Sequence, residues 1–492
     1  MAAANESTDA SINYSVQGNL DKRFELRKQA ILNDESITID EKTEAIKKLI
    51  RGYNHYKILY NEGTKRLCEN CSLECFAISY CEYCIQNYLK NNFSNWTSGN
   101  YDIDNLIQHC QMKTLSPDKI IEWIPFNNLQ DVKYITKGGC SEIYLANWID
   151  GPYTEWDSKE QQLKRNGPRK IILKKLENVE SINRSWFEEA KSHLTLCNKY
   201  ETLVQCYGLT QDLLNGDYML VMFLMDTDLR KYLQHQRTLK EKLNAIRGII
   251  RAIYDIHDNN AIHRDLHSGN ILHVSIFWFI SDFGFCGPAD KPLNSIYGNL
   301  PYIAPEVIIG KKATFASDIY SIGILMWEIS SGQPPFINYE HNYDLAMRIV
   351  NGMRPKIISG IPTECVKLMK QCWDADPLKR PNTGTLVKEF DKLFEELYNS
   401  IEFNTLDCNN SSQISQTNSN SKSYSPSTSK LYHFKNLPDP KNATEEQQEE
   451  FHSKPYDFTI PNVDEINDNS LKDQEELELS IDIEDITKDL KD

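Results

Sequence analysis

Short apolar runs and helically spaced apolar residues follow one another most densely between Val132 and about Leu397. Within this region, apolar runs typical of strands alternate with segments at helical spacing. This mixture predicts a folded domain of strands and helices over that region. Upstream, apolar residues at helical spacing between Asp21 and about Tyr60 predict two short helices that form a hairpin or stalk.

Both ends of the chain are polar and lack the apolar patterning of the central region. Residues 1–18 are small and polar, and residues 411–430 are rich in Ser and Asn, so we expect disorder in both. From Asp439 to Asp492 there are 18 acidic and 5 basic residues, a net charge of −13 out of −16 for the chain. The acidity therefore belongs to a tail, which we expect to be solvated.

Composition narrows the class of protein. A chain of 492 residues with 40% apolar residues can fill two or three domains, and the net charge of −16 argues against nucleic acid as a partner. No stretch reaches the ~18–20 apolar residues of a membrane span, and the N-terminus lacks a signal pattern. We expect a cytoplasmic protein, with a nuclear one also compatible, and its 13 cysteines as thiols or metal ligands.

Five cysteines lie close together at 68–84. Cys68 and Cys71 form one pair, Cys81 and Cys84 form another, and Cys75 is left over. Two such pairs suit a zinc ion held by four thiolates, because each turn directs both sulfurs at one ion. Four protein ligands leave no open position, so we expect a structural zinc. The alternative is a set of free buried thiols.

Three motifs carry a family resemblance. The segments AIHRDLHSGNIL at 261–272, ISDFGF at 280–285 and PYIAPEV at 301–307 resemble the catalytic loop, the metal-binding segment and the APE segment of protein kinases. The sequences of residues 317–329 and 372–381 are similar to the corresponding segments of the tyrosine-kinase-like group of kinases, including its expanded sets in fungi. The resemblance covers about 129–397. It implies an α+β fold with a small antiparallel β lobe, a mainly helical large lobe, and protein substrates.

The resemblance also implies roles for individual residues. Asp265 would orient the substrate hydroxyl, and Asn270 and Asp282 would hold Mg²⁺, which prefers oxygen ligands. Lys174 would contact the α and β phosphates of ATP, with Lys175 as the alternative on the opposite face of the strand. Glu189 would pair with that lysine. Its neighbour Glu188 is the second choice for the pairing.

The nucleotide-binding segments match the family less completely. Gly138 keeps the central position of the glycine-rich loop and Gly139 adds flexibility, but Thr136 and Ser141 stand where glycines are usual. Ile143 would roof the adenine. Met222 would be the gatekeeper, and the backbone of 223–225, including Phe223 and Leu224, would bind the base. No function is assigned to the long connection at 147–170.

Other positions resemble supporting residues of the family. Asp318 matches the buried Asp that braces the catalytic loop, and Glu306 and Arg380 match a buried ion pair of the large lobe. Arg264 can pair with a phosphorylated activation segment, for which Ser295 is the expected site. Tyr297 and Tyr302 are expected to be packing groups.

Two departures bear on specificity. His267 replaces the lysine usual in Ser/Thr kinases, and Asn299 replaces a threonine, although the overall resemblance favours transfer to Ser or Thr over Tyr. The alternative function is a pseudokinase, a nucleotide-binding scaffold or adaptor. The expected organisation is 1–18 disordered, 19–66 helical, 67–110 a zinc module, 111–128 a linker, 129–397 the kinase domain and 398–492 a disordered tail.

Overall fold

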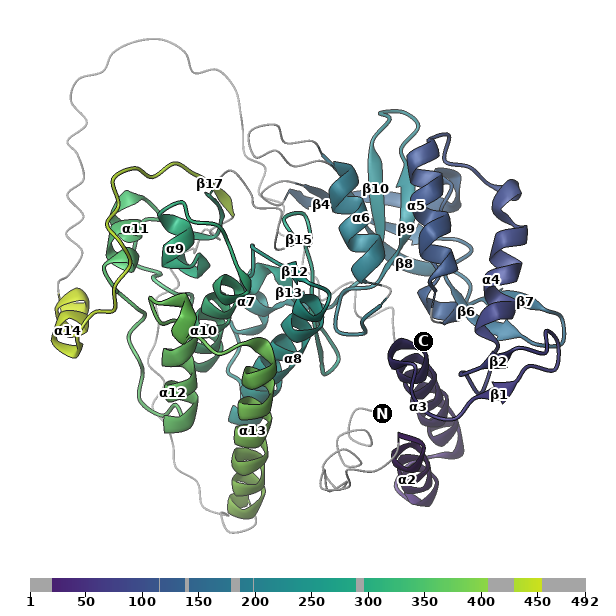
Figure 1. Cartoon of the computed structure of the whole chain (residues 1–492), viewed down its shortest axis with the longest axis horizontal. Coiled ribbons are helices and arrows are strands. Elements are labelled where there is room, and N and C mark those ends of the chain that lie inside the picture. Colours follow the sequence, from purple (N-terminus) through teal and green to yellow (C-terminus); the bar gives the residue numbers. More distant parts are fainter. Residues whose placement is uncertain are drawn as a thin grey trace. The chain divides into compact units, whose positions relative to one another are not determined.

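The computed structural model describes residues 20–114, 116–137, 141–177, 186–197, 199–288, 296–405 and 429–453 (Figure 1). Near the N-terminus, α2 (Leu20–Asn33) and α3 (Ile39–Tyr60) form the hairpin predicted from the sequence, although α3 is longer than expected. Thr38 and Glu41 cap the start of α3 reciprocally. The ring of Phe24 stacks on that of Tyr53 with centroids 4.1 Å apart, which joins the two helices.

The cysteine-rich segment folds around a small hairpin and a helix. Strands β1 (Arg66–Leu67) and β2 (Glu74–Cys75) pair antiparallel, and α4 (Glu82–Asn91) and α5 (Tyr101–Met112) follow. Short 3₁₀ turns here and later occupy Phe93–Asn95, Pro117–Lys119, Phe126–Asn128, Ser268–Asn270, Leu300–Tyr302 and Pro377–Lys379.

A six-stranded sheet forms the small lobe. Its order is β3 (Glu122–Trp123), β9 (Cys206–Gln211), β10 (Tyr218–Phe223), β8 (Arg169–Lys175), β5 (Glu142–Trp148) and β4 (Leu129–Lys137). The pairs are antiparallel except β3 with β9. The expectation of an antiparallel sheet with one helix, α6 (Trp186–Leu196), is confirmed for the strands within the kinase-like segment. The parallel edge strand β3 comes from the segment expected to be a linker.

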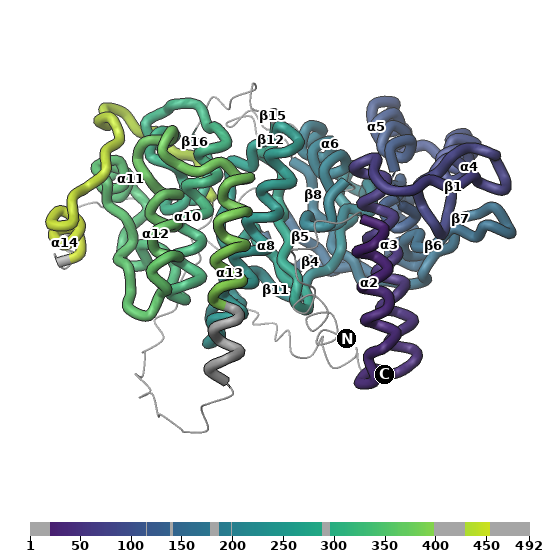
Figure 2. The backbone as a smooth tube through the Cα atoms, turned by 60° about the horizontal axis from the view of Figure 1, so that its bottom comes forward, coloured from purple at the N-terminus to yellow at the C-terminus, as the bar shows by residue number. Residues whose placement is uncertain are grey.

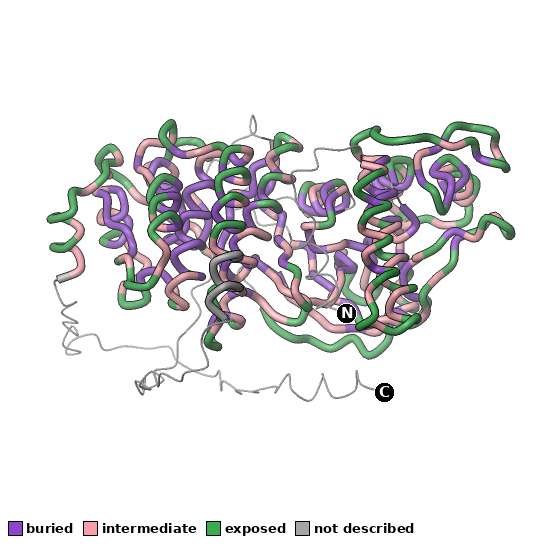
Figure 3. Tube along the Cα trace, turned by 90° about the horizontal axis from the view of Figure 1, so that it is seen from below, coloured by how far each residue is buried: buried purple, intermediate pink, exposed green. Residues whose placement is uncertain are grey.

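Helices dominate the large lobe, as predicted (Figure 2). They are α7 (Leu229–Tyr232), α8 (Leu239–Asp258), α9 (Pro305–Ile308), α10 (Phe315–Ser331), α11 (Tyr343–Val350), α12 (Thr363–Cys372) and α13 (Thr383–Thr405). Every residue of α10 from Ser317 to Ile329 is buried, so this helix lies in the interior of the lobe. Figure 3 shows buried segments in purple gathered inside the fold and exposed segments in green at its surface. The all-round apolar sequence of α10 is typical of a helix that other helices surround.

Short strands carry the loops of the site. Strands β11 (Thr227–Asp228), β13 (Ile271–Val274) and β14 (Phe277–Ile280) form one sheet, and β12 (Ala261–Ile262) pairs with β15 (Gly287–Pro288). The tight hairpin expected between Asn270 and Asp282 is β13–β14. Within the described part of the chain, no helix is both long and apolar enough to cross a membrane.

The long connection at 147–170 forms a second hairpin, β6 (Tyr153–Asp157) with β7 (Gln162–Arg165). Trp156 and Leu163 of this hairpin are buried in one apolar cluster with residues of the cysteine-rich segment. The ring of Trp156 meets Tyr88 of α4 edge-on at 5.7 Å, and the Asn70 side chain donates a hydrogen bond to Gln161. The hairpin of this connection is therefore the part of the small lobe against which the cysteine-rich segment packs.

The tail departs from the expectation that it is disordered from residue 398. Helix α13 continues to Thr405, and residues 429–453 contain β17 (Lys430–Tyr432) and α14 (Glu445–Ser453). Strand β17 pairs with β16 (Ile296–Gly298) of the large lobe. The physical reason is a set of aromatic residues within the polar tail, Tyr432 among them, that bury their rings against the lobe.

Candidate active site

Lys174, Glu189 and Asp282 meet at the centre of the site. The Lys174 ammonium lies 2.9 Å from the Glu189 carboxylate and 2.7 Å from that of Asp282. The side chains of Lys174 and Glu189 are 8% and 0% exposed, so each charge needs the other. The neighbouring Lys175 points to the other face of β8, where it pairs with Asp217 at 2.9 Å.

Helix α6 presents Glu189, and α5 holds α6 from outside the small lobe. Ile103 and Ile107 of α5 are fully buried in one cluster with Ala190 and Leu194 of α6. The Cys110 thiol also lies 3.7 Å from the Leu194 carbonyl. The segment that precedes the kinase-like domain thus fixes the helix that orients the ion pair, a link that the sequence did not reveal.

Asp318 fixes the loop that carries Asp265. One carboxylate oxygen of Asp318 accepts the His263 backbone N–H at 2.8 Å, and the other accepts the Arg264 N–H at 3.0 Å. Burial alone would raise the pKa of Asp318, but the interactions with His257 and His263, including the hydrogen bonds from both residues, outweigh burial and lower this pKa. Asp318 is therefore a charged brace, in the position expected from the sequence.

Asn270 and Asp282 lie beside the same loop. The Asn270 amide N–H donates to the Asp265 carbonyl at 2.9 Å, which leaves the amide oxygen of Asn270 for another partner. The backbone of Asp282 has φ +61°, a left-handed conformation that costs about 1 kcal/mol or more in a non-glycine residue. The ring of the next residue, Phe283, is fully buried and meets the ring of His193 at 5.0 Å.

His267 is buried two residues after Asp265. Its Nδ1 accepts the Gly269 backbone N–H at 3.0 Å, and its Nε2 lies 3.8 Å from the Asp265 carboxylate. Burial, followed by the charge of Arg230, lowers the pKa of His267 to about 3. The side chain is therefore a neutral imidazole at physiological pH, unlike the charged lysine usual at this position in Ser/Thr kinases.

The lowered pKa of His267 predicts how the stability of the folded protein depends on pH. The unfolded chain binds a proton at His267 below pH ~6.5, whereas the folded chain does so only near its lowered pKa. Stability is therefore lost as the pH falls through this window. The unfolding free energy of each protein is measured by urea denaturation at pH 7 and at pH 5. We expect the decrease from pH 7 to pH 5 to be about 2 kcal/mol smaller in His267→Asn than in wild type. Equal losses in the two proteins would contradict the buried neutral imidazole.

The expected nucleotide-contacting residues lie on the strands around Lys174. Ile143 faces Lys174 across the β5–β8 pair, and Met222 is buried on β10 opposite Ile172 of β8. Phe223 ends β10, and Leu224 follows it. Ser141 is buried just before β5. Gly138 and Gly139 lie outside the described residues, as does Ser295.

A bidentate ion pair supports the large lobe below the site. The Arg380 guanidinium donates to both carboxylate oxygens of Glu306, at 2.8 and 2.7 Å, and its side chain is 0% exposed. Ser317 of α10 donates to the same carboxylate at 3.0 Å. The pair therefore joins α9 to α10 and to the segment before α13. This is the structural arrangement expected from the sequence.

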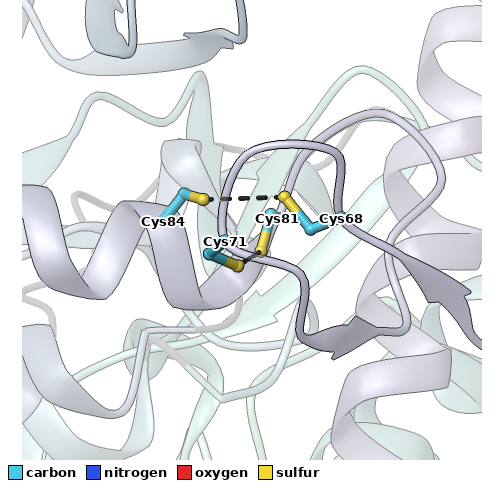
Figure 4. A group of neighbouring side chains, drawn as sticks. All are labelled: Cys68, Cys71, Cys81 and Cys84. Carbon is cyan, nitrogen blue, oxygen red and sulfur yellow. Dashed lines mark hydrogen bonds between the residues drawn. The ribbon is translucent and has the colours of Figure 1, made fainter.

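The four paired cysteines form a separate cluster (Figure 4). The sulfurs of Cys68 and Cys84 are 3.7 Å apart, those of Cys71 and Cys81 are 3.6 Å apart, and all four lie within 4.8 Å of one another. A tetrahedral zinc ion with 2.3 Å bonds places its sulfurs about 3.8 Å apart, so the thiols fit this ion. Cys75 is buried but lies outside the cluster.

Sequence reasoning missed one residue of the site, Ser429. Its hydroxyl lies 2.8 Å from the Asp265 carboxylate, although the two residues are 164 positions apart. The only local signal was the apolar and aromatic segment 431–434, which stands out within a polar tail.

Comparisons with known proteins agree with this geometry. The family model for protein tyrosine and serine/threonine kinases matches residues 129–390, more than half of the chain. The dual serine/threonine and tyrosine protein kinases of Macaca mulatta and Homo sapiens are 31% identical over 212 residues and 33% identical over 196 residues. These matches cover 41% and 38% of this chain, but only 23% and 21% of the relatives.

A third relative is a protein of Acanthamoeba polyphaga mimivirus, provisionally named a serine/threonine-protein kinase/receptor. It is 34% identical over 171 residues, which is 33% of this chain and 10% of the relative. The chain thus spans less than a quarter of the length of the curated relatives it matches. Because the family model covers more than half of the chain and its motif residues converge in the structure, the chain belongs to the protein tyrosine and serine/threonine kinase family.

Proposed function

We propose that this protein transfers the γ-phosphoryl group of ATP to serine or threonine hydroxyls of protein substrates. The observation that carries the proposal is the buried contact of Lys174 with both Glu189 and Asp282, next to the loop that holds Asp265. A lysine this buried is costly to retain unless its charge is used or paired. Family membership supports ATP as the phosphoryl donor.

Each residue has a distinct task in this proposal. Lys174, oriented by Glu189, binds the α and β phosphates of ATP. Asp265 accepts the hydrogen of the substrate hydroxyl and directs its oxygen at the γ phosphorus. His267 is neutral, so it offers a hydrogen bond near the reacting oxygen and no net positive charge. Asp318 keeps the loop in place while the reaction proceeds.

The residues beside Lys174 fit Mg²⁺. Asp282 offers carboxylate oxygens, and Asn270 offers an amide oxygen because its N–H is already bonded to the Asp265 carbonyl. These are the hard oxygen ligands that Mg²⁺ prefers. When bound, the ion supplies positive charge that offsets the phosphates of ATP.

The test is phosphate transfer from labelled ATP to myelin basic protein. We expect wild type to transfer label and Lys174→Met to lose it by about 10²-fold or more, since one preorganised charge is removed. Lys175→Met is the matched control, because Lys175 lies on the opposite face and pairs with Asp217, and we expect it to stay within about twofold. Equal losses in the two variants would contradict the role of Lys174. Acid hydrolysis of the product separates phosphoserine and phosphothreonine from phosphotyrosine.

We further propose a structural zinc ion held by Cys68, Cys71, Cys81 and Cys84. The distances among the sulfurs support this, and the thiols come from a hairpin turn and the start of α4, as in a closed four-ligand site. These cysteines are free thiols rather than disulfides. Because thiols persist in a reducing compartment, they also favour the cytoplasm as the place where the protein acts.

The zinc proposal predicts the metal content of the purified protein. We expect about one zinc per chain in wild type, and loss of the metal in Cys84→Ser together with unfolding of the segment around β1 and β2. Cys75→Ala is the matched control and should keep the metal, since Cys75 lies outside the cluster. Elemental analysis and hydrogen exchange measure both effects. A wild-type protein without zinc, or equal loss in Cys75→Ala, would contradict the site.

A further inference from the structure

The hydroxyl of Ser429 lies against Asp265, the residue to which the proposed function assigns the acceptor hydroxyl. It donates a hydrogen bond to the Asp265 carboxylate at 2.8 Å and lies 3.0 Å from Nε2 of His267. Because Nδ1 of His267 accepts the Gly269 N–H, the proton of the neutral ring is assigned to Nε2, which then donates to the Ser429 oxygen. The serine is thus held through both its hydrogen and its oxygen.

The residues after Ser429 bind as an added β-strand. Strand β17 pairs antiparallel with β16, the strand of the activation segment that precedes Leu300. The register aligns Lys430 with Gly298, Leu431 with Tyr297 and Tyr432 with Ile296. Strand addition of this kind is a recurring way to bind an extended peptide, with backbone hydrogen bonds for affinity and side-chain pockets for specificity.

Gly298 leaves room for this contact. A Cβ atom at Gly298 would lie 3.3 Å from the Asp265 carboxylate and 3.2 Å from Ile303, and the backbone there has φ +141°. Tyr432, one residue beyond the strand centre, is only 6% exposed and its ring stacks with that of Phe434 at 5.2 Å. The buried ring of Tyr432 therefore fixes the register of the strand, and the missing side chain at Gly298 leaves space beside the Asp265 carboxylate.

The tail continues along the large lobe with further specific contacts. The Asn442 side chain donates to Asp374 and accepts the Ala375 backbone N–H, both at 2.9 Å. The Gln448 amide donates to the Gly352 carbonyl at 2.6 Å. These hydrogen bonds lie well beyond β17. The tail therefore binds the large lobe over a long segment that extends past the strand.

We propose that Ser429 is the chain's own phosphoacceptor, phosphorylated by the kinase domain of the same molecule. This inference rests on the proposed function. The Ser429 oxygen forms a bond to the γ phosphorus of ATP, the bond from that phosphorus to the β,γ-bridging oxygen breaks, and ADP leaves. The hydroxyl proton passes to the Asp265 carboxylate and then to water.

Tethering favours this acceptor over outside substrates. A segment of the same chain has an effective concentration in the millimolar range at its docking site, far above that of a second molecule at nanomolar concentration. Once phosphorylated, Ser429 would carry about −1.5 to −2 charges next to the Asp265 carboxylate, so repulsion favours release of the tail. The serine at this position also supports a Ser/Thr acceptor.

The test uses the full-length chain, dephosphorylated and then given ATP and Mg²⁺. We expect mass spectrometry to find phosphate at Ser429, with a rate constant that is unchanged over an about 100-fold dilution of the protein, because the reaction is intramolecular. Ser429→Ala should lose this phosphate, and Thr428→Ala, the neighbouring hydroxyl residue, should keep it. A rate proportional to chain concentration, or phosphate at Thr428 and none at Ser429, overturns the proposal.

A second variant tests the docked strand itself. Tyr432→Ala removes the buried anchor, so we expect the Ser429 rate to fall about tenfold or more while transfer to myelin basic protein is retained. Hydrogen exchange supplies a readout that does not need activity, since the amides of 430–432 should be protected in wild type and exposed in Tyr432→Ala. Unprotected amides in wild type would overturn the docking.

Myelin basic protein separates the two possible failures. Label in that protein without phosphate at Ser429 overturns this inference and leaves the proposed function intact. No label in either the chain or myelin basic protein contradicts the proposed function, and self-phosphorylation fails with it.

Discussion

Replacing Asp265 with Asn lowers the rate of phosphoryl transfer by about 10³-fold. The carboxylate accepts the hydrogen of the acceptor hydroxyl, and proton transfer to a positioned side chain contributes about 10²–10⁴-fold to a rate. The Asn amide has the same size and keeps one acceptor oxygen, but it cannot take up a proton. Saturating ATP with labelled γ-phosphate and myelin basic protein as acceptor measures the effect on kcat.

Two further measurements make this prediction specific. The KM for ATP should stay within about twofold, because Asp265 acts on the acceptor and the nucleotide is held elsewhere. Asp344→Asn, at an exposed position in the first turn of α11, is the matched control and should keep the wild-type rate. A loss of less than about tenfold in Asp265→Asn, with the fold intact, would show that the hydroxyl is oriented by another group.

Replacing Arg380 with Ala destabilises the large lobe by about 3–5 kcal/mol. The change leaves the buried Glu306 carboxylate without its bidentate partner, and an uncompensated buried charge costs this much. Arg380 also donates to the backbone carbonyls of Ala316 and Asp374, both at 2.8 Å, and those bonds are lost too. Chemical denaturation measures the change in unfolding free energy.

An exposed ion pair is the control for Arg380. Lys367 and Glu364 on α12 are 2.9 Å apart with side chains more than half exposed, so Lys367→Ala should cost less than about 0.5 kcal/mol. If Arg380→Ala does not fold, Arg380→Lys keeps the charge, loses the fork geometry and should fall between the two. A cost below about 1 kcal/mol for Arg380→Ala would contradict the structural role of the pair.

The residues of the site that sequence reasoning located lie within short segments of fixed local geometry. The resemblance favours Lys174 over Lys175 and Glu189 over Glu188, and the structure pairs Lys174 with Glu189. The resemblance to the kinase motifs implies these choices, and a shift by one residue along a strand or helix would turn the side chain to another face. The resemblance likewise implies the buried brace at Asp318, which the structure places against the backbone of His263 and Arg264.

The contacts that sequence reasoning did not locate join segments far apart in the chain. Nothing within 147–170 shows that Trp156 packs against Tyr88 of the cysteine-rich segment. Likewise, the segment around Tyr432 is too short for a clear period within a polar tail, and its strand forms only against β16. Pairing energy from a distant partner decides these structures, and local sequence carries little of it.

Transfer of labelled phosphate from ATP by the full-length wild-type chain, beside Asp282→Asn, tests the central claim most directly. We expect stable label on protein serine or threonine in wild type, and its loss in Asp282→Asn, which removes one of the oxygen ligands proposed for Mg²⁺. The melting temperature of wild type with and without ATP is recorded in parallel. No label in wild type, with a melting temperature that still rises in ATP, would contradict the account and indicate a nucleotide-binding scaffold.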